Sequence, residues 1–412
     1  MGSIDSAILD LSAVELAGLV RGGQVSAVEV TEVFLRRIEE RIAGHAFITT
    51  CPEYALRMAA RRPVGPLAGV PLAVKDMFLT AGIRTTCGSS ILRDYVPKRT
   101  AAAVRTLEAA GAILVGKANQ HEFAWGVTSQ NPHWGTVENP VHPGRVAGGS
   151  SGGNAAALAD RLCTIGLGTD AGGSVRIPAA CCDVVGFRPA RGVVSTAGMF
   201  CLTTSFDTVG PMARSVRDCA LIYSVLTGRP IPAPRLAGLR VGVLAPTGLE
   251  DELCRLGALV EEVRLPEPEA DPMAVFATEC ALTHLPWFPA RRDEYGPDAQ
   301  AKLDAAHRVT AVDYRRGLAA LRGLRRRARI HPAVDLFVSP TIGTDPPSAD
   351  CWEPDVRPAM LKYTRVFSYL GWPAIAIGNL QLAGRDDATV LGAALAWEQA
   401  HDTARPSMAA EP

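Results

Sequence analysis

The chain has 412 residues, in which 42 Lys plus Arg balance 42 Asp plus Glu, and 48% of the residues are hydrophobic. This length allows one large α/β domain or two or three small ones. A formal charge of zero excludes the basic excess that nucleic acids and anionic membrane surfaces attract, so we expect a small-molecule ligand and no nucleic acid.

The ten cysteines are scattered, and none has the spacing of a zinc site. We therefore expect reduced thiols and no metal, and we expect the adjacent Cys181 and Cys182 to pack as small hydrophobic side chains. The start of the chain does not resemble a signal peptide, and no apolar run approaches the roughly 20 residues that span a bilayer. The sequence predicts a cytoplasmic protein that binds no membrane.

Two capped helices are expected near the N-terminus. Ser12 with Glu15, and Ser26 with Glu29, have the three-residue spacing of a capping box, in which a hydroxyl and a carboxylate satisfy the free amides at a helix start. The first helix is expected to stop at Gly22-Gly23.

Short apolar runs then alternate with helical stretches. The expected strands are residues 70–74, 113–115, 164–167, 184–187, 239–244, 336–339 and 374–377. The expected helices are residues 101–110, 154–161, 216–226 and 387–400. Such alternation favours an α/β fold with buried central strands.

The proline-rich residues 230–234 mark the best boundary. We expect one domain over residues 1–403, with a catalytic core at 1–230, a variable helical substrate-side region at 231–335 and a return to the core sheet at 336–403. Residues 404–412 are predicted to be a flexible tail. The arginine-rich run near residues 322–327 is typical of a solvated helix face, so we assign it no partner.

Two glycine-rich loops, residues 148–153 and 168–174, can be flexible turns or anion-binding loops, because amides without Cβ crowding can converge on an oxyanion. No Gly-Lys-Ser/Thr follows either loop, which excludes a phosphate-binding P-loop. A dinucleotide fingerprint near residues 166–171 is equally weak, since Pro178 interrupts the helix that should follow.

One alternative gives Ser151 a catalytic role. Residues 149–153 fit the Gly-x-Ser-x-Gly pattern of a nucleophile elbow, with Asp386 or Asp387 and then His401 in the order of an α/β-hydrolase. Against this interpretation, His401 lies beside the predicted tail, where a general base would be poorly held.

Lysine is rare in this chain, because only five of the 42 basic residues are lysine. Lys75 nevertheless ends an apolar strand. Burial there would lower the pKa of its amine, so that a neutral amine could accept a proton. The other interpretation is a strand-end lysine paired with Asp76.

These residues carry a family resemblance. Gly-Gly-Ser-Ser-Gly-Gly at 148–153, followed by Gly-Thr-Asp-Ala-Gly-Gly-Ser at 168–174, resembles the signature of the amidase signature family of serine amidases. Ser150 and Ser174 are 24 residues apart, as the two active serines of that family are. Residues from about 10 to 230 resemble the family throughout.

The resemblance implies a mixed, mostly parallel central β-sheet covered by helices on both faces. It implies that Ser174 is the nucleophile, Ser150 a relay on a cis peptide bond and Lys75 the base, with no metal or organic cofactor. An oxyanion hole is implied at the backbone amides of Ala171, Gly172, Gly173 and Ser174. Supporting hydrogen bonds are implied for Ser151, Asp170 and Arg176.

The implied function is hydrolysis of a small-molecule carboxamide to a carboxylate and ammonia or an amine. Two alternatives stay open: an amidotransferase-type subunit that delivers ammonia to a partner, and a catalytically idle scaffold. The amidotransferase subunits of the family carry an acidic substrate-recognition residue near the position of Leu361, which ranks the hydrolase first. A homodimer is left open, as is the choice between pocket lining and core packing for Arg365, Tyr369 and Trp372.

Overall fold

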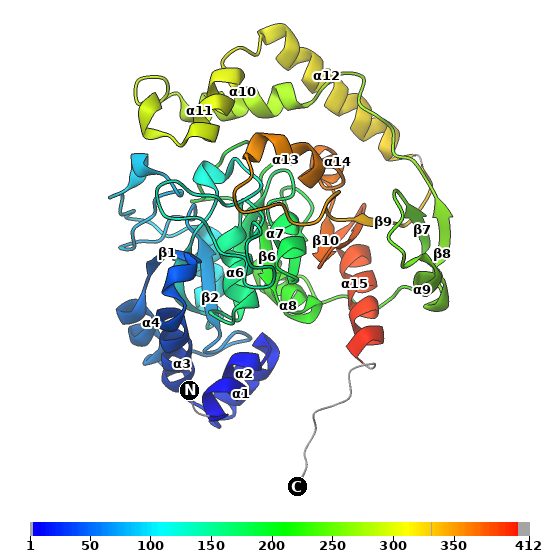
Figure 1. Cartoon of the computed structure of the whole chain (residues 1–412). Helices are drawn as coiled ribbons and strands as arrows, with labels where there is room; N and C mark the ends of the chain where they lie inside the picture. Colours follow the sequence, from blue (N-terminus) through cyan, green and yellow to red (C-terminus); the bar gives the residue numbers. More distant parts are fainter. Residues whose placement is uncertain (1–2, 331, 403–412) are drawn as a thin grey trace.

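Both expected capping boxes form in the computed structural model, which describes residues 3–330 and 332–402 (Figure 1). Helix α1 (Ser3–Asp10) precedes α2 (Ala13–Arg21), which Ser12 and Glu15 cap, and Ser26 and Glu29 cap α3 (Ala27–Glu40). The predicted tail at 404–412 lies outside the described residues.

A sheet of eleven strands, counted over the described residues, forms the centre of the molecule in the order β1-β3-β2-β4-β6-β5-β10-β11-β9-β7-β8. The strands are β1 (Phe47–Thr50), β2 (Pro71–Lys75), β3 (Ile113–Ala118), β4 (Ile165–Asp170), β5 (Val185–Arg188), β6 (Thr208–Ala213), β7 (Arg240–Val243), β8 (Leu259–Glu262), β9 (Leu336–Pro340), β10 (Ala374–Ile377) and β11 (Leu380–Gly384). Every strand that the sequence predicted is present, and β1, β6, β8 and β11 are additional.

The sheet is mixed as expected, but the expected parallel majority is wrong. Strand β2 runs parallel to β3 and β4, and β7 runs parallel to β8 and β9, whereas the other six neighbouring pairs of described strands are antiparallel. One reason is the tight hairpin between β10 and β11, in which Gly378 adopts a φ of 52° and only Asn379 follows before the next strand.

Alternating side chains divide the core between the two faces of the sheet. Leu72 and Val74 join one hydrophobic cluster and Ala73 joins another, because neighbouring residues of a strand point to opposite faces. Helices α8 (Val216–Thr227) and α15 (Asp387–Asp402) pack with the first cluster. Helices α6 (Gly152–Ala159) and α7 (Arg176–Cys181) pack with the second, so helices cover both faces.

The remaining helices surround this core (Figure 1). They are α4 (Pro52–Ala59), α5 (Ala102–Ala109), α9 (Glu250–Arg255), α10 (Met273–His284), α11 (Pro297–Ala306), α12 (Ala311–Ala328), α13 (Glu353–Met360) and α14 (Arg365–Leu370). Short 3-10 helices occur at Ile42–Gly44, Ser90–Leu92, Glu122–Ala124 and Arg292–Glu294. Helices α10, α11 and α12 arch over α13 and α14, which lie between the arch and the sheet. The region expected to be helical, residues 231–335, also supplies β7 and β8, and the proposed division of the domain stays a prediction.

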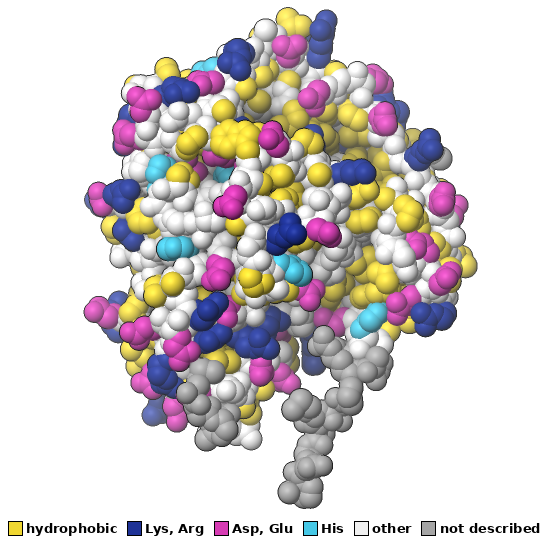
Figure 2. All heavy atoms as spheres, in the orientation of Figure 1, with side chains coloured by type: hydrophobic (Ala, Val, Ile, Leu, Met, Phe, Trp, Pro, Cys, Tyr) yellow, Lys and Arg dark blue, Asp and Glu magenta, His cyan; other side chains and the backbone are white. Residues whose placement is uncertain are grey.

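All ten cysteines are free thiols, and Cys181 and Cys182 are buried as expected. Over residues 3–330 and 332–402, no group of histidine, cysteine or acidic side chains is arranged to hold a metal ion. In the same ranges, no helix has both the length and the apolar character needed to cross a bilayer. Acidic and basic side chains are interspersed over the face shown in Figure 2.

Removing one capping hydroxyl tests how the sequence starts its helices. Ser26→Ala leaves the amide of Glu29 without its hydroxyl acceptor, so we expect a loss of about 1 kcal/mol in the free energy of unfolding. Denaturant unfolding followed by circular dichroism measures it. Ser6→Ala, in exposed helix, is the control and should change stability by less than about 0.5 kcal/mol. Equal effects of the two substitutions would contradict the capping role.

Candidate active site

Lys75 is fully buried where β2 ends. Its Nζ donates to Ser150 Oγ at 2.7 Å and to Thr169 Oγ1 at 2.9 Å. Burial lowers the pKa of Lys75 to about 7, against the opposing attraction of Asp207 and Asp170. A pKa in this range makes the neutral amine abundant at ordinary pH.

The pairing of Lys75 with Asp76, the other interpretation of the sequence, is wrong. Asp76 instead forms a buried ion pair with Lys117, whose Nζ lies 3.1 Å from Asp76 Oδ1. Lys117 also donates to the carbonyl of Phe78 and to Thr85. Lys75 therefore has no ion pair with Asp76, and its hydrogen-bond partners are hydroxyl groups.

The parallel pairing of β2 with β4 explains why Lys75 meets these hydroxyls. Val74 pairs with Leu167, so the ends of the two strands bring Lys75 and Thr169 together. Ser150 lies in the glycine loop that leads into α6, after the expected cis peptide bond between Gly149 and Ser150.

Ser174 lies in the loop after β4 and reaches the same place through backbone contacts. The amide of Ser151 donates to the carbonyl of Ser174 at 3.1 Å, and Ser151 Oγ donates to the carbonyl of Thr169 at 3.3 Å. Within residues 3–330 and 332–402, no hydrogen bond joins the hydroxyls of Ser150 and Ser174. Catalytic hydrogen bonds often tighten only when substrate binds.

The loop of residues 171–174 has a conformation that needs glycine. Gly173 has a φ of 143°, and a Cβ there would lie 2.5 Å from Thr364 Oγ1. Thr364 Oγ1 donates to the carbonyl of Gly172 at 2.7 Å, which holds the loop from the side of α14. In the described part of the chain, the amides of residues 171–174 donate to no protein acceptor.

A buried cluster of charges anchors this loop. Asp170 accepts two hydrogen bonds from Arg176, each 3.0 Å long, and a third from Arg188 at 3.1 Å, and all three side chains are fully buried. Burial alone would raise the pKa of Asp170, but the two guanidinium groups lower it to about 2. Arg176 further bonds the carbonyl of Thr364 and the side chain of Gln381. The cluster therefore joins the glycine loop to α14 and β11.

Some of these partners were not predicted from the sequence. Thr169 lies in the second glycine loop, but no role was assigned to it, to Arg188 or to Thr364, and only the tertiary contacts show their roles. The rarity of lysine was a usable signal for two others, because Lys117 is fully buried and the side chain of Lys302 is only 9% exposed.

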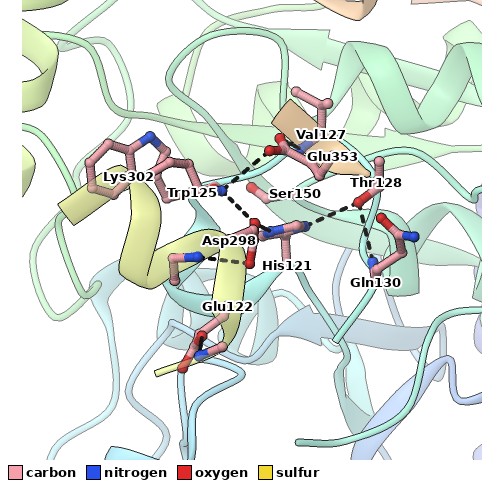
Figure 3. A network of polar contacts seen from close by, with 12 residues as sticks. His121, Glu122, Trp125, Val127, Thr128, Gln130, Ser150, Asp298, Lys302 and Glu353 are labelled. Atoms are coloured by element: carbon pink, nitrogen blue, oxygen red, sulfur yellow. Dashed lines mark hydrogen bonds and ion pairs between the residues drawn. The ribbon is translucent and has the colours of Figure 1, made fainter. Parts of the chain in front are cut away.

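A second charged network connects the arch of helices to Ser150 (Figure 3). Asp298 of α11 lies 2.7 Å from His121 Nε2 and 2.6 Å from Lys302 Nζ. The backbone amide of His121 donates to the carbonyl of Ser150 at 3.1 Å. Burial would raise the pKa of Asp298, but His121 and Lys302 together hold it well below its usual range.

Glu353 of α13 extends this network along the loop of residues 124–127. It accepts a hydrogen bond from the amide of Val127 at 3.0 Å and one from Arg357 at 3.0 Å, and it lies 3.5 Å from Lys302. The lysine and arginine outweigh burial and lower the pKa of Glu353 to about 2. A hydrogen bond from the amide of Val127 thus fixes α13 to the loop beside Ser150, and the ion pair between Lys302 and Glu353 joins α11 to α13.

Ser174 opens into a pocket between the core and these helices. The core supplies Ala124, Trp125, Gly126, Val127, Ala171, Gly172 and Ser174. The later part of the chain supplies Met273, Phe276, Arg357, Leu361, Arg365 and Tyr369. Of the three aromatic or basic residues that the sequence left undecided, Arg365 and Tyr369 line the pocket. Trp372 instead stacks on Phe337 in the core.

The nucleophile-elbow alternative for Ser151 is wrong. His401 Nε2 pairs with Glu252 at 3.1 Å, and Asp387 accepts from the amide of Ala190. Asp386 caps its own helix through Thr389. The members of the expected triad each bond elsewhere, and Ser151 is fully buried among residues of the core.

Asp170→Asn tests the buried cluster. The substitution leaves two buried guanidinium groups without their carboxylate, and breaking a buried pair costs about 3–5 kcal/mol of unfolding free energy. Denaturant unfolding measures the loss. Asp304→Asn, which removes a partly exposed partner of Arg292, is the matched control and should cost at most about 1 kcal/mol. Similar losses for both would show that the cluster does not anchor the loop.

The comparison with curated sequences finds amidotransferase subunits. A glutamyl-tRNA(Gln) amidotransferase subunit of Methylococcus capsulatus is 41% identical over 290 residues, which cover 61% of this chain and 60% of that protein. The chain spans between about half and 60% of the length of the curated relatives that it matches. These relatives favour the amidotransferase alternative that the sequence left open.

The comparison with solved structures finds amidases as well. A crystal structure described as an amidase has a TM-score of 0.87 and 32% identity, covering 95% of this chain and 100% of that one. A glutamyl-tRNA(Gln) amidotransferase subunit of Thermotoga maritima has a TM-score of 0.75 and 27% identity, covering 96% and 94%. The family model described as Amidase matches residues 29–237, which are about half of the chain. Both glycine loops lie within this range. The chain therefore belongs to the amidase signature family and has the fold of that family.

Proposed function

We propose that this chain hydrolyses a small-molecule carboxamide through an acyl-enzyme on Ser174. The observation that carries the proposal is the hydrogen bond between the fully buried Lys75 amine, with its pKa lowered to about 7, and the hydroxyl of Ser150. A serine hydroxyl is a weak nucleophile until a base takes its proton, and a neutral amine can do so without a histidine.

The proton moves in two steps. Ser174 attacks the amide carbonyl while its proton passes to Ser150 Oγ and the Ser150 proton passes to the Nζ lone pair of Lys75. Thr169 keeps the amine in place by accepting its second hydrogen bond at 2.9 Å. The ammonium formed is stabilised by the charges of Asp207 and Asp170, which favour the protonated amine.

The amides of residues 171–174 stabilise the negative charge on the carbonyl oxygen. These amides donate to no protein acceptor among the described residues. Hydrogen bonds with Asp170 and Thr364 hold the loop in place. Donors fixed before the reaction are effective because they need no reorganisation as charge develops.

Collapse of the tetrahedral intermediate breaks the carbon–nitrogen bond. Protonated Lys75, again through Ser150, supplies a proton to the leaving nitrogen, and ammonia or an amine departs. Water then attacks the ester on Ser174, with Lys75 and Ser150 again taking a proton, and releases the carboxylate. These steps conserve atoms and charge without a redox step or a cofactor.

The second candidate is an amidotransferase-type subunit that passes ammonia to a partner, and the curated relatives favour it. Two observations favour the hydrolase. Leu361 lines the pocket at the position where the resemblance places an acidic recognition residue. The amidase structure also has the higher TM-score, 0.87 against 0.75, at nearly the same coverage of this chain.

Ser174→Ala should lower kcat/KM for ammonia release by about 10³-fold or more, because no other group can form the acyl-enzyme. A panel of aliphatic, aryl and ureido amides and glutamine provides the substrates, and released ammonia is measured. A fluorophosphonate should label the parent but not the variant. Ser195→Ala, an exposed serine outside the pocket, is the control and should keep full activity.

The outcomes separate the candidates. Turnover of simple amides by the isolated chain supports the hydrolase. Labelling of Ser174 combined with turnover of glutamine alone supports the amidotransferase. A folded parent that is neither labelled nor active supports the idle scaffold, and activity of the Ser174→Ala variant equal to that of the parent contradicts the mechanism.

The pH profile tests Lys75 directly. Only the neutral amine acts as a base, so activity should be low below the pKa of about 7 and should reach a plateau above it. Between pH 6 and pH 8 we expect kcat/KM for a non-ionising amide to rise about tenfold. Asp207→Asn removes a charge that raises this pKa, so it should move the midpoint to lower pH. A midpoint near the ordinary lysine value would contradict the assignment.

A further inference from the structure

Three residues that line the pocket of Ser174 each have a buried side-chain polar atom without a hydrogen-bond partner among the described residues. These atoms are Trp125 Nε1, Arg365 Nε and Tyr369 Oη, and each is buried although its residue lines the pocket. Buried polar atoms are nearly always hydrogen-bonded, so unpaired ones that line the same pocket indicate a ligand. All three groups can donate a hydrogen bond, which indicates a ligand rich in acceptors.

The charge of the pocket indicates the sign of that ligand. No acidic residue lines it, and its two arginines differ in their surroundings. Arg357 pairs with Glu353 at 3.0 Å, whereas Arg365 has no ion pair within the described ranges. A partly buried guanidinium without a counter-charge is costly, and an anion in the pocket would remove that cost.

The neighbouring groups agree with an anion at Arg365. Burial raises the pKa of Tyr369 to about 12, while the charge of Arg365 and a side-chain interaction with it oppose the shift and Asp271 assists it. The phenol therefore lies beside the guanidinium and remains a proton donor. Asp271 and Asp313 line the wider groove that adjoins the pocket at Trp125, Met273 and Arg357. The acidic side chains therefore line the adjoining groove, whereas Arg365 lines the pocket that also contains Ser174.

The position of Arg365 connects the anion site to the reaction. Arg365 directly follows Thr364, whose hydroxyl is bonded to the carbonyl of Gly172 in the nucleophile loop. Met273, Phe276 and Leu361 supply apolar surface in the same pocket. A substrate that fits has an amide at Ser174, a short apolar spacer and an acidic group at Arg365.

We propose that the substrate is a carboxamide that carries a second, ionised carboxylate, such as a half-amide of a short dicarboxylic acid, and that Arg365 binds this carboxylate. Tyr369 and Trp125 donate to it as well. A carboxylate has the planar geometry and the acceptor sites that a guanidinium and two further donors can satisfy together. The proposal rests on the proposed chemistry of Ser174, and it adds a selectivity for amides that carry a carboxylate.

Matched substrate pairs test the selectivity. Succinamate and glutaramate are compared with butyramide and valeramide, which have the same chain lengths but no carboxylate. Ammonia release should show kcat/KM higher by about 10- to 100-fold for the acids, because the arginine is otherwise left unpaired. Equal values for acid and neutral amides would overturn the proposal while leaving the chemistry of Ser174 intact.

Arg365→Met removes the charge and keeps an apolar side chain. It should lower kcat/KM for the acids far more than kcat/KM for butyramide, and so remove most of the preference for the acids. Arg365→Lys should restore part of the preference. Arg326→Met, on the exposed side of α12, controls for net charge and should leave both substrates unchanged. Equal losses on acid and neutral amides in folded Arg365→Met would overturn the proposal.

Inhibition gives an answer even where a variant folds poorly. Glutarate should compete with butyramide in the parent far better than butyrate does, and Tyr369→Phe should weaken that inhibition without removing ammonia release. Equal inhibition by the two acids would overturn the proposal. Absence of ammonia release from every amide, with no labelling of Ser174, would instead refute the proposed function itself.

Discussion

The proposed chemistry of this site depends on burying the amine of Lys75 away from water. Lys75 has two hydroxyls as its hydrogen-bond partners and no carboxylate in contact, so burial dominates and lowers the pKa of the amine to about 7. The contrast with Lys117 is instructive, because that equally buried lysine has Asp76 at 3.1 Å. Two lysines at the ends of neighbouring parallel strands thus differ in one respect: Lys117 pairs with a carboxylate, and Lys75 does not.

Charged side chains of α11 and α13 hold these two helices against the site. Asp298 and Glu353 come from helices outside the region that holds the glycine loops, and they bind His121 and Val127 of the core. His121 in turn bonds the carbonyl of Ser150. A change in the arch of helices can therefore alter the geometry around Ser150, although no residue of the arch belongs to the proposed relay.

The sequence predicted the features that local chemistry determines. The capping boxes at Ser12 and Ser26 and the end of the strand at Lys75 follow from short segments, whereas the cis bond before Ser150 was implied by the family resemblance. Strand β6 was missed because Gly210 and Pro211 count against a strand. Pro211 is tolerated there because pairing with β5 extends only over Met212 and Ala213. The partner of His121, 177 residues away, has no local signal at all.

Hydrogen bonding separates the groups that build the site from the groups that are available to a substrate. Arg176, Arg188 and Arg357 are all basic residues close to the nucleophile loop or its pocket, but each is already bonded to a carboxylate. Arg365 is in the same pocket and is not. The family resemblance assigned a supporting role to Arg176, but the sequence alone could not show that Arg365 lacks a carboxylate partner, because arginine is the common cation of this chain. The unpaired donors of the folded pocket, rather than the number of its charges, therefore indicate where selectivity for the substrate resides.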